Sequence, residues 1–219
     1  MPVRKVSFVP EEFYHIYNRG NSRQTIYHTK DDHNRFVALL YLANGTESFD
    51  FREIDTDSIF EYERGGQQVS IGAYCLMPNH FHILLTPLVE EGVTLFMRKL
   101  TVGYSMYFNK KHHRTGSLFE GRFKSEHVDS DNYLKYLFSY IHLNPVKLLQ
   151  PDCQQEGIAN LDETFHYLDD YQYSSYVDNK IKRPQLGILS REQFPEYFTT
   201  KQEYDTEMKD WLTYNNEPE

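Results

Sequence analysis

The sequence predicts an α+β fold, in which helices pack on a single antiparallel sheet. Segments with the two-residue alternation of strands and segments with helical spacing follow one another in the order β-α-β-β-α, with a further helix behind them. Two of the strands, residues 69–77 and 80–86, are separated only by Pro78 and Asn79, so they form a hairpin and must run antiparallel. One sheet covered by helices buries the apolar faces of such elements.

A strand and a helix precede this hairpin. Residues 13–17 alternate aromatic and polar side chains and run into a turn at 18–21, which predicts a strand. Residues 30–43 group their apolar side chains at helical spacing and stop before Asn44 and Gly45. A polar, irregular insert near residues 45–68 follows, and we expect a further hairpin there.

Helices dominate the rest of the chain. The spacing of apolar residues predicts a helix over 93–109, followed by a basic, glycine-containing loop over 110–121. Ser130 is a favourable N-cap for a second helix, which Pro145 limits. A last helix is expected around residues 203–214.

Length and composition favour one domain with an appended segment. The 219 residues suffice for one well-buried domain, taken as residues 1–150, followed by an acidic, tyrosine-rich extension at 151–219. Cys75 and Cys153 lie far apart, so disulfides do not organise the fold. No stretch approaches the roughly 20 apolar residues of a membrane span, and we expect a soluble protein of the cytoplasm.

The acidic net charge of −9 is confined to the extension. Residues 151–219 contain fifteen Asp and Glu against six Lys and Arg, so residues 1–150 are neutral overall. Within them, residues 98–127 carry seven Lys and Arg against two Glu, with aromatic residues interleaved. A basic patch of this kind is typical of nucleic-acid binding, although a solvated helix face produces the same pattern.

Two histidines are candidate metal ligands. In the run His80-Phe81-His82, strand alternation places both imidazoles on one face, about 6–7 Å apart along the strand. Imidazole pairs completed by oxygen ligands suit Mg²⁺, Mn²⁺ and similar ions. Two half-exposed strand histidines without a metal are the alternative, but the apolar surroundings make unpartnered imidazoles costly to bury.

Tyr140 and Asn144 form a second candidate pair, because residues four apart share one face of a helix. A phenol hydroxyl can attack phosphorus, while a neighbouring amide oxygen completes the coordination of a metal that polarises the phosphate. Tyr133 and Tyr136 lie on the same face as Tyr140, and an aromatic stripe of this kind is also typical of core packing.

Five sequence blocks follow one another within roughly residues 10–178: Tyr14-His15-Ile16-Tyr17-Asn18-Arg19-Gly20-Asn21, Met77-Pro78-Asn79-His80-Phe81-His82, Gly116-Ser117-Leu118-Phe119-Glu120-Gly121-Arg122-Phe123-Lys124, Tyr140-Ile141-His142-Leu143-Asn144-Pro145-Val146 and Tyr173-Ser174-Ser175-Tyr176. In these blocks and in their order, the chain resembles the REP-associated tyrosine transposases. They are a branch of the single-tyrosine HUH transposases, which move or cut DNA through single strands and hairpins.

The resemblance implies roles for the candidate residues. His80 and His82 would be the HUH metal ligands, Tyr140 the nucleophile and Asn144 the third ligand. Tyr133, two turns before Tyr140 on the same helix face, stays open as a rival nucleophile.

The resemblance also implies a ferredoxin-like core and a catalytic role for residues 1–150. Two departures are visible: the insert near 45–68 is longer than the family pattern, and the segment after Val177 has no clear counterpart in it.

The function implied is that of a single-strand or hairpin DNA endonuclease and strand transferase, which uses Mg²⁺ or Mn²⁺ and a 5′-phosphotyrosyl intermediate. A catalytically inactive hairpin-DNA-binding protein and a metal nuclease that uses water are the alternatives. The family contains both monomers and homodimers. The expected DNA contacts are basic and aromatic residues: Arg19, Arg23, Arg114, Phe119, Arg122, Phe123 and Lys124.

Overall fold

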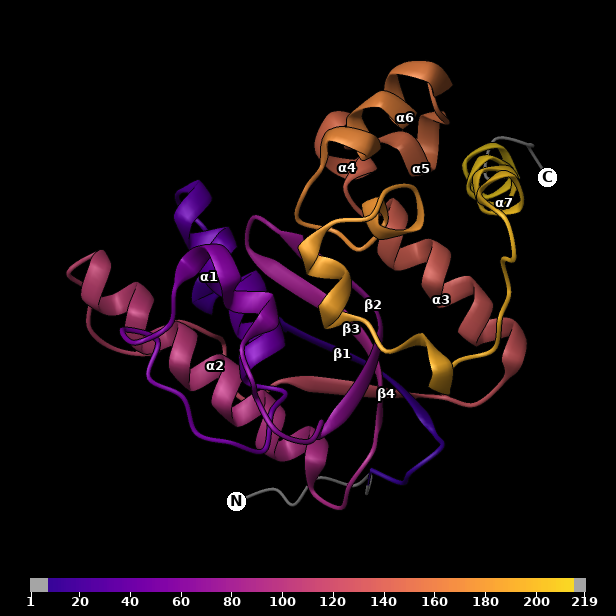
Figure 1. Ribbon diagram of the computed structural model, residues 1–219. Helices are drawn as coiled ribbons and strands as arrows, with labels where there is room; N and C mark the ends of the chain where they lie inside the picture. Colours follow the sequence, from indigo (N-terminus) through magenta and orange to yellow (C-terminus); the bar gives the residue numbers. More distant parts are fainter. Residues whose placement is uncertain (1–7, 215–219) are drawn as a thin grey trace.

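The computed structural model describes residues 8–214 and confirms the α+β fold with an antiparallel sheet (Figure 1). The strands are β1 (Phe13–Arg19), β2 (Val69–Met77), β3 (His80–Pro87) and β4 (Lys124–Val128). Helix α1 (Lys30–Leu42) lies between β1 and β2 in the chain, and α2 (Gly92–Lys111) between β3 and β4. This order and the sheet order β2-β3-β1-β4 are those of a ferredoxin-like core, as expected.

The two faces of the sheet are covered by different helices. Helices α1 and α2 pack on one face, and α3 (Asp131–Leu143) lies on the other (Figure 1). Phe81 and Ile83 of β3 belong to the core under α1 and α2, whereas Leu84 belongs to the core under α3. Because side chains alternate along a strand, His80 and His82 face α3.

Strand β4 was not predicted, because its sequence Lys-Ser-Glu-His-Val lacks the alternation of apolar and polar residues. Among the described strands it pairs only with β1, so it is an edge strand, and it is largely exposed apart from Val128. Outside the insert near residues 45–68, the other predicted elements up to Pro145 are present, and their ends agree with the prediction to within two residues. The N-cap prediction is also confirmed, since the Ser130 hydroxyl accepts a hydrogen bond from the Tyr133 amide.

The insert near residues 45–68 forms a hairpin only at its ends, where Gly45 bridges to Gln67. Its interior is a loop with a short 3-10 helix, Thr56–Glu61, in place of the expected strands. Arg64 fastens the insert to α1, because its guanidinium lies 3.7 Å from the centre of the Tyr41 ring and donates to the Tyr41 carbonyl. The insert therefore extends the α1 side of the molecule.

The C-terminal extension packs on the domain. Segment 171–176 runs beside the edge strand β2, where the Leu76 amide donates to the Tyr173 carbonyl over 2.9 Å. Lys135 of α3 forms an ion pair of 2.8 Å with Glu207. The expected last helix is present as α7 (Lys201–Tyr214), whereas the short helices α4 (Val146–Leu149), α5 (Cys153–Glu156) and α6 (Leu161–Asp170) were not predicted.

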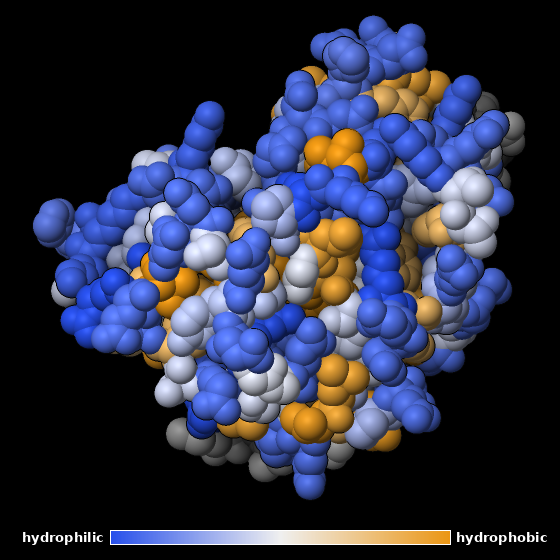
Figure 2. Space-filling model, in the orientation of Figure 1, coloured by the Kyte–Doolittle hydropathy of each residue, from blue (hydrophilic) through white to orange (hydrophobic). Residues whose placement is uncertain are grey.

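Hydrophilic residues cover most of the face of the molecule seen in Figure 2, and hydrophobic residues form scattered patches between them. Within residues 8–214, no helix is both long enough and apolar enough to cross a membrane.

Candidate active site

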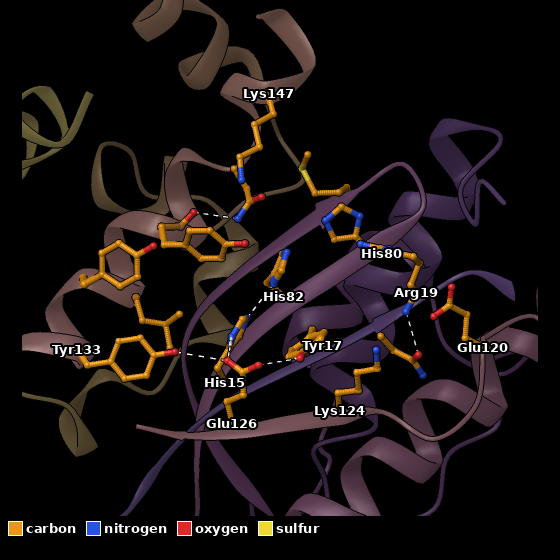
Figure 3. A pocket seen from close by; sticks show the side chains of 16 residues that line it. His15, Tyr17, Arg19, His80, His82, Glu120, Lys124, Glu126, Tyr133 and Lys147 are labelled. Carbon is orange, nitrogen blue, oxygen red and sulfur yellow. Dashed lines mark hydrogen bonds and ion pairs between the residues drawn. The ribbon is translucent and has the colours of Figure 1, made fainter. Parts of the chain in front are cut away.

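A cavity of ≈ 650 Å³ opens between the sheet and α3 (Figure 3). Strands β1, β3 and β4 contribute its floor, and α3 with the start of α4 contributes its wall. Of the predicted site residues, the cavity brings together His80, His82, Asn144, Tyr140, Tyr133, Arg19 and Lys124. Residues distant in sequence thus meet at one place.

The β3 strand presents both histidines to the cavity. The centres of the His80 and His82 rings are 5.0 Å apart. Burial lowers the pKa of His80 to about 4, and the nearby positive charges of Arg19 and Lys147 act in the same direction. Burial also lowers the pKa of His82 well below its usual value. Both rings are therefore neutral near pH 7, which is the form that binds metal ions.

Asn79 fixes the proton position on His80. The His80 Nδ1 lies 2.6 Å from the Asn79 Oδ1, and the Asn79 amide nitrogen donates to the Arg23 carbonyl over 3.2 Å. With its nitrogen turned to that carbonyl, the amide offers only an acceptor to His80, so the imidazole proton belongs on Nδ1. The Nε2 of His80 consequently keeps its lone pair.

Tyr140 and Asn144 face these histidines from α3. The Tyr140 ring is half-buried, with its centre 5.5 Å from that of His82. Asn144 is the C-cap of α3, and its amide nitrogen donates to the Tyr140 carbonyl over 2.9 Å. That hydrogen bond engages the nitrogen and leaves Oδ1 as the acceptor end of the side chain. The nucleophile candidate and the amide candidate are thus held on adjacent turns.

The residues present fit a divalent metal ion. Among residues 8–214, no three His, Cys, Asp or Glu side chains are grouped so that they alone would hold one. A metal at His80 and His82 would need a donor of another kind, and the Asn144 amide oxygen lines the same cavity. Two imidazoles with an amide oxygen and positions left for water or phosphate are compatible with Mn²⁺ or Mg²⁺.

Tyr133 stands in a different environment from Tyr140. Its hydroxyl lies 3.5 Å from a carboxylate oxygen of Glu126. Burial, followed by the Glu126 charge, raises the pKa of Tyr133. A phenol that loses its proton less readily is a poorer nucleophile.

Buried hydrogen bonds hold the end of α3 that carries Tyr140. His142 is fully buried, with its Nε2 2.8 Å from the Ser175 hydroxyl and its Nδ1 2.9 Å from the Tyr204 hydroxyl. Ser175 also accepts from the Tyr74 amide of β2 over 2.8 Å. His142 therefore ties α3 to the sheet and to α7.

Part of the chain is similar to a known protein family. Residues 11–144, more than half of the chain, match a family described as IS200-like transposases. The chain belongs to the IS200-like transposase family. A solved structure of a REP-associated tyrosine transposase bound to a REP hairpin resembles it with a TM-score of 0.50 and 13% sequence identity, covering 82% of this chain and 85% of that one. No match was found among curated proteins.

Five of the predicted DNA contacts lie outside the cavity lining: Arg23, Arg114, Phe119, Arg122 and Phe123. The structure does not support the predicted DNA contact of Phe119, because its side chain is 5% exposed and packs edge-on against Phe81 in the core. A ring in that position has no face open to a base.

The Arg114 guanidinium donates to the side-chain oxygen of Gln24 over 3.0 Å, which braces the basic loop against the turn after β1. Phe123 stacks on Phe8 with 6.3 Å between ring centres.

Several residues that line the cavity were not predicted: His15, Tyr17, Glu126 and Lys147. His15 and Tyr17 alternate on β1 in the same way as His80 and His82 on β3, so the strand pattern carried a signal for them. Lys147 lies with its ammonium 5.0 Å from the centre of the Tyr140 ring. Glu126 belongs to β4, the strand that the sequence pattern did not predict.

The stability of the protein should depend on pH through His142. Burial lowers its pKa from 6.5 to about 3, so between these values the unfolded chain binds a proton that the folded chain does not. Protonation of His142 in the unfolded chain therefore costs no stability above pH 6.5, and it lowers the free energy of unfolding as the pH drops towards 3. Between pH 6.5 and 4.5 the loss due to His142 should be on the order of 2–3 kcal/mol.

Urea unfolding with EDTA present, at a series of pH values, measures this loss. His142→Gln should be less stable at pH 7.5 yet show a shallower dependence on pH. Equal slopes for the two proteins would show that His142 does not titrate as expected.

Proposed function

We propose that this chain is a metal-dependent endonuclease and strand transferase for single-stranded or hairpin DNA, with Tyr140 as the nucleophile. The observation that carries the proposal is the meeting, in one cavity, of two neutral histidines, an amide side chain and a tyrosine from different elements. A cavity lined in this way matches the chemistry that family membership leads one to expect.

The proposed reaction exchanges one phosphodiester bond for another. The Tyr140 oxygen bonds to the phosphorus, and the bond from phosphorus to the 3′ oxygen breaks. The phenol gives up its proton, and the departing 3′ oxygen takes one up. The product is a 5′-phosphotyrosine with a free 3′-hydroxyl, and attack by a second 3′-hydroxyl reverses the chemistry and joins strands.

His80, His82 and Asn144 would hold Mg²⁺ or Mn²⁺. When bound, the metal would neutralise the non-bridging phosphate oxygens and orient the phosphate. The protein adds its own cations at the cavity, Arg19, Lys124 and Lys147. Lys147 is the one beside the Tyr140 ring, where its charge attracts a phosphate to the nucleophile.

The substrate should be unpaired DNA beside a hairpin. Tyr17 and Tyr136 line the cavity as well, and aromatic rings are the surfaces on which unpaired bases stack. The solved structure that resembles this chain carries a REP hairpin, which supports the same class of ligand.

A hairpin with a single-stranded flank should bind roughly tenfold or more tightly than a blunt duplex of equal length. Binding should also weaken steeply with added salt despite the acidic net charge, because local cations make the phosphate contacts. Fluorescence anisotropy at matched ionic strength tests both expectations. Equal affinity for hairpin and duplex would contradict the proposed substrate.

Covalent trapping tests the function itself. The chain would be incubated with labelled hairpin DNA and Mn²⁺, then denatured and run on a gel, where a protein–DNA adduct should appear. Cleavage without an adduct would identify a metal nuclease that uses water. Binding without cleavage in either Mg²⁺ or Mn²⁺ would identify a binding protein that has lost activity.

A further inference from the structure

Three side chains from neighbouring strands form a row of contacts that ends on His82 (Figure 3). Glu126 of β4 lies opposite His15 of β1, and its Oε2 is 3.8 Å from the His15 Nδ1. The other ring nitrogen of His15, Nε2, is 2.8 Å from the Nδ1 of His82. The function described above uses His82 but neither His15 nor Glu126.

The proton between the two imidazoles can belong to either ring, and the choice decides what His82 can do. If His15 donates, the single proton of a neutral His82 sits on Nε2, which leaves no lone pair there for a metal. If His82 donates from Nδ1, its Nε2 is bare. The proton position on His15 therefore controls the donor capacity of His82.

The carboxylate of Glu126 resolves this choice. His15 is 5% exposed, and its neutral ring has one proton that either nitrogen can carry. Glu126 lies on the Nδ1 side of that ring, and a carboxylate attracts the proton to the nearer nitrogen. The contact of 3.8 Å is long for a hydrogen bond but close enough for this electrostatic preference. Nε2 of His15 then accepts from His82.

Two phenols keep Glu126 in place as an acceptor. The Tyr17 hydroxyl donates to its Oε1 over 2.8 Å, and the Tyr133 hydroxyl lies 3.5 Å from its Oε2. This arrangement assigns Tyr133 a supporting contact with Glu126, distinct from the role of nucleophile. It also gives the polar edge strand β4 a place in the site.

We propose that Glu126 and His15 are positioning residues that keep His82 protonated on Nδ1, so that its Nε2 is available to a metal ion. The use of that nitrogen rests on the proposed function, whereas the proton position itself exists without metal. Partners behind metal-binding histidines commonly act in this way. Here the partner is a second histidine, oriented in turn by a carboxylate.

Nitrogen-15 NMR of the imidazoles in the metal-free protein at pH 7 tests the proton position directly. In the wild-type chain, His82 should carry its proton on Nδ1. His15→Leu removes the acceptor, so the proton should shift towards Nε2, the nitrogen that isolated neutral histidine favours. His15→Gln offers an amide oxygen near the position of Nε2 and should restore the Nδ1 form.

The affinity for Mn²⁺, measured by calorimetry, gives a second readout. His15→Leu should weaken binding roughly 10–100-fold and His15→Gln should recover most of the loss, as is typical for partners of ligating histidines. Glu126→Gln should weaken it less, by several-fold on the same scale. Because the Glu126 side chain is 52% exposed, that variant keeps the test open if His15→Leu fails to fold.

The outcomes separate this inference from the proposed function. A wild-type His82 protonated on Nε2, or a His15→Leu protein with unchanged proton position and Mn²⁺ affinity, would overturn the positioning role. A wild-type His82 protonated on Nδ1 that shifts in His15→Leu supports the role even if Mn²⁺ does not bind, and in that case the metal site of the proposed function falls.

Discussion

Tyr140→Phe should abolish the covalent protein–DNA adduct while DNA binding survives. The substitution removes one oxygen from a half-buried ring, so the change in unfolding free energy should stay within about 0.5 kcal/mol. The oxygen is nevertheless the atom that attacks phosphorus, and its loss should lower cleavage by on the order of 10³-fold or more. Denaturing gels with labelled hairpin DNA measure the adduct, and anisotropy measures binding.

Tyr133→Phe and Tyr136→Phe are the matched controls, because they remove the same atom from the same helix. Both variants should still form the adduct, since neither residue has an amide side chain one turn onward. Tyr133→Phe loses only a contact of 3.5 Å to Glu126. If mass spectrometry placed the nucleotide on Tyr133, or if Tyr140→Phe formed adduct at the normal rate, the assignment of the nucleophile would be wrong.

The sequence predicted those site residues that lie on a strand or helix with a clear periodic pattern of apolar residues. His80 and His82 alternate with fully buried Phe81 and Ile83, so the strand pattern fixed their common face. Tyr140 and Asn144 share a helix whose start and end were marked by Ser130 and Pro145. The meeting of the two pairs across the cavity followed only from the family resemblance, since periodicity carries no information on tertiary pairing.

The parts that were missed depend on tertiary contacts between polar residues. Glu126 is on a short, exposed edge strand, which has no apolar face and hence no periodic signal. In the sequence, Lys147 looks like any other lysine of a solvated surface. Only its approach to the Tyr140 ring in the structure marks it as a site residue. Phe119 shows the opposite error, because a phenylalanine among basic residues suggests stacking on bases while the ring fills the core beside Phe81.

His80→Ala should remove metal-dependent cleavage with little effect on folding. His80 is half-buried and its hydrogen bond is to Asn79, a neighbour in the β2–β3 turn, so the protein loses little packing. Its Nε2 is one of the expected metal donors, and the loss of a ligand should exceed the 10–100-fold typical for a partner behind a ligand. We therefore expect Mn²⁺ affinity to fall by roughly 100-fold or more, with cleavage falling in parallel.

His166→Ala is the control for adventitious metal binding, because His166 is exposed on α6 and does not line the cavity. It should change neither Mn²⁺ affinity nor cleavage.

His82→Ala should match His80→Ala in cleavage but also lower stability by about 1–3 kcal/mol, since it leaves the buried Nε2 of His15 without its partner. Cleavage that continued in EDTA, or an unchanged Mn²⁺ affinity in His80→Ala, would show that these histidines do not hold the metal. A loss of cleavage with affinity intact would instead place His80 in contact with the DNA, because only the metal-ligand role requires both quantities to fall together.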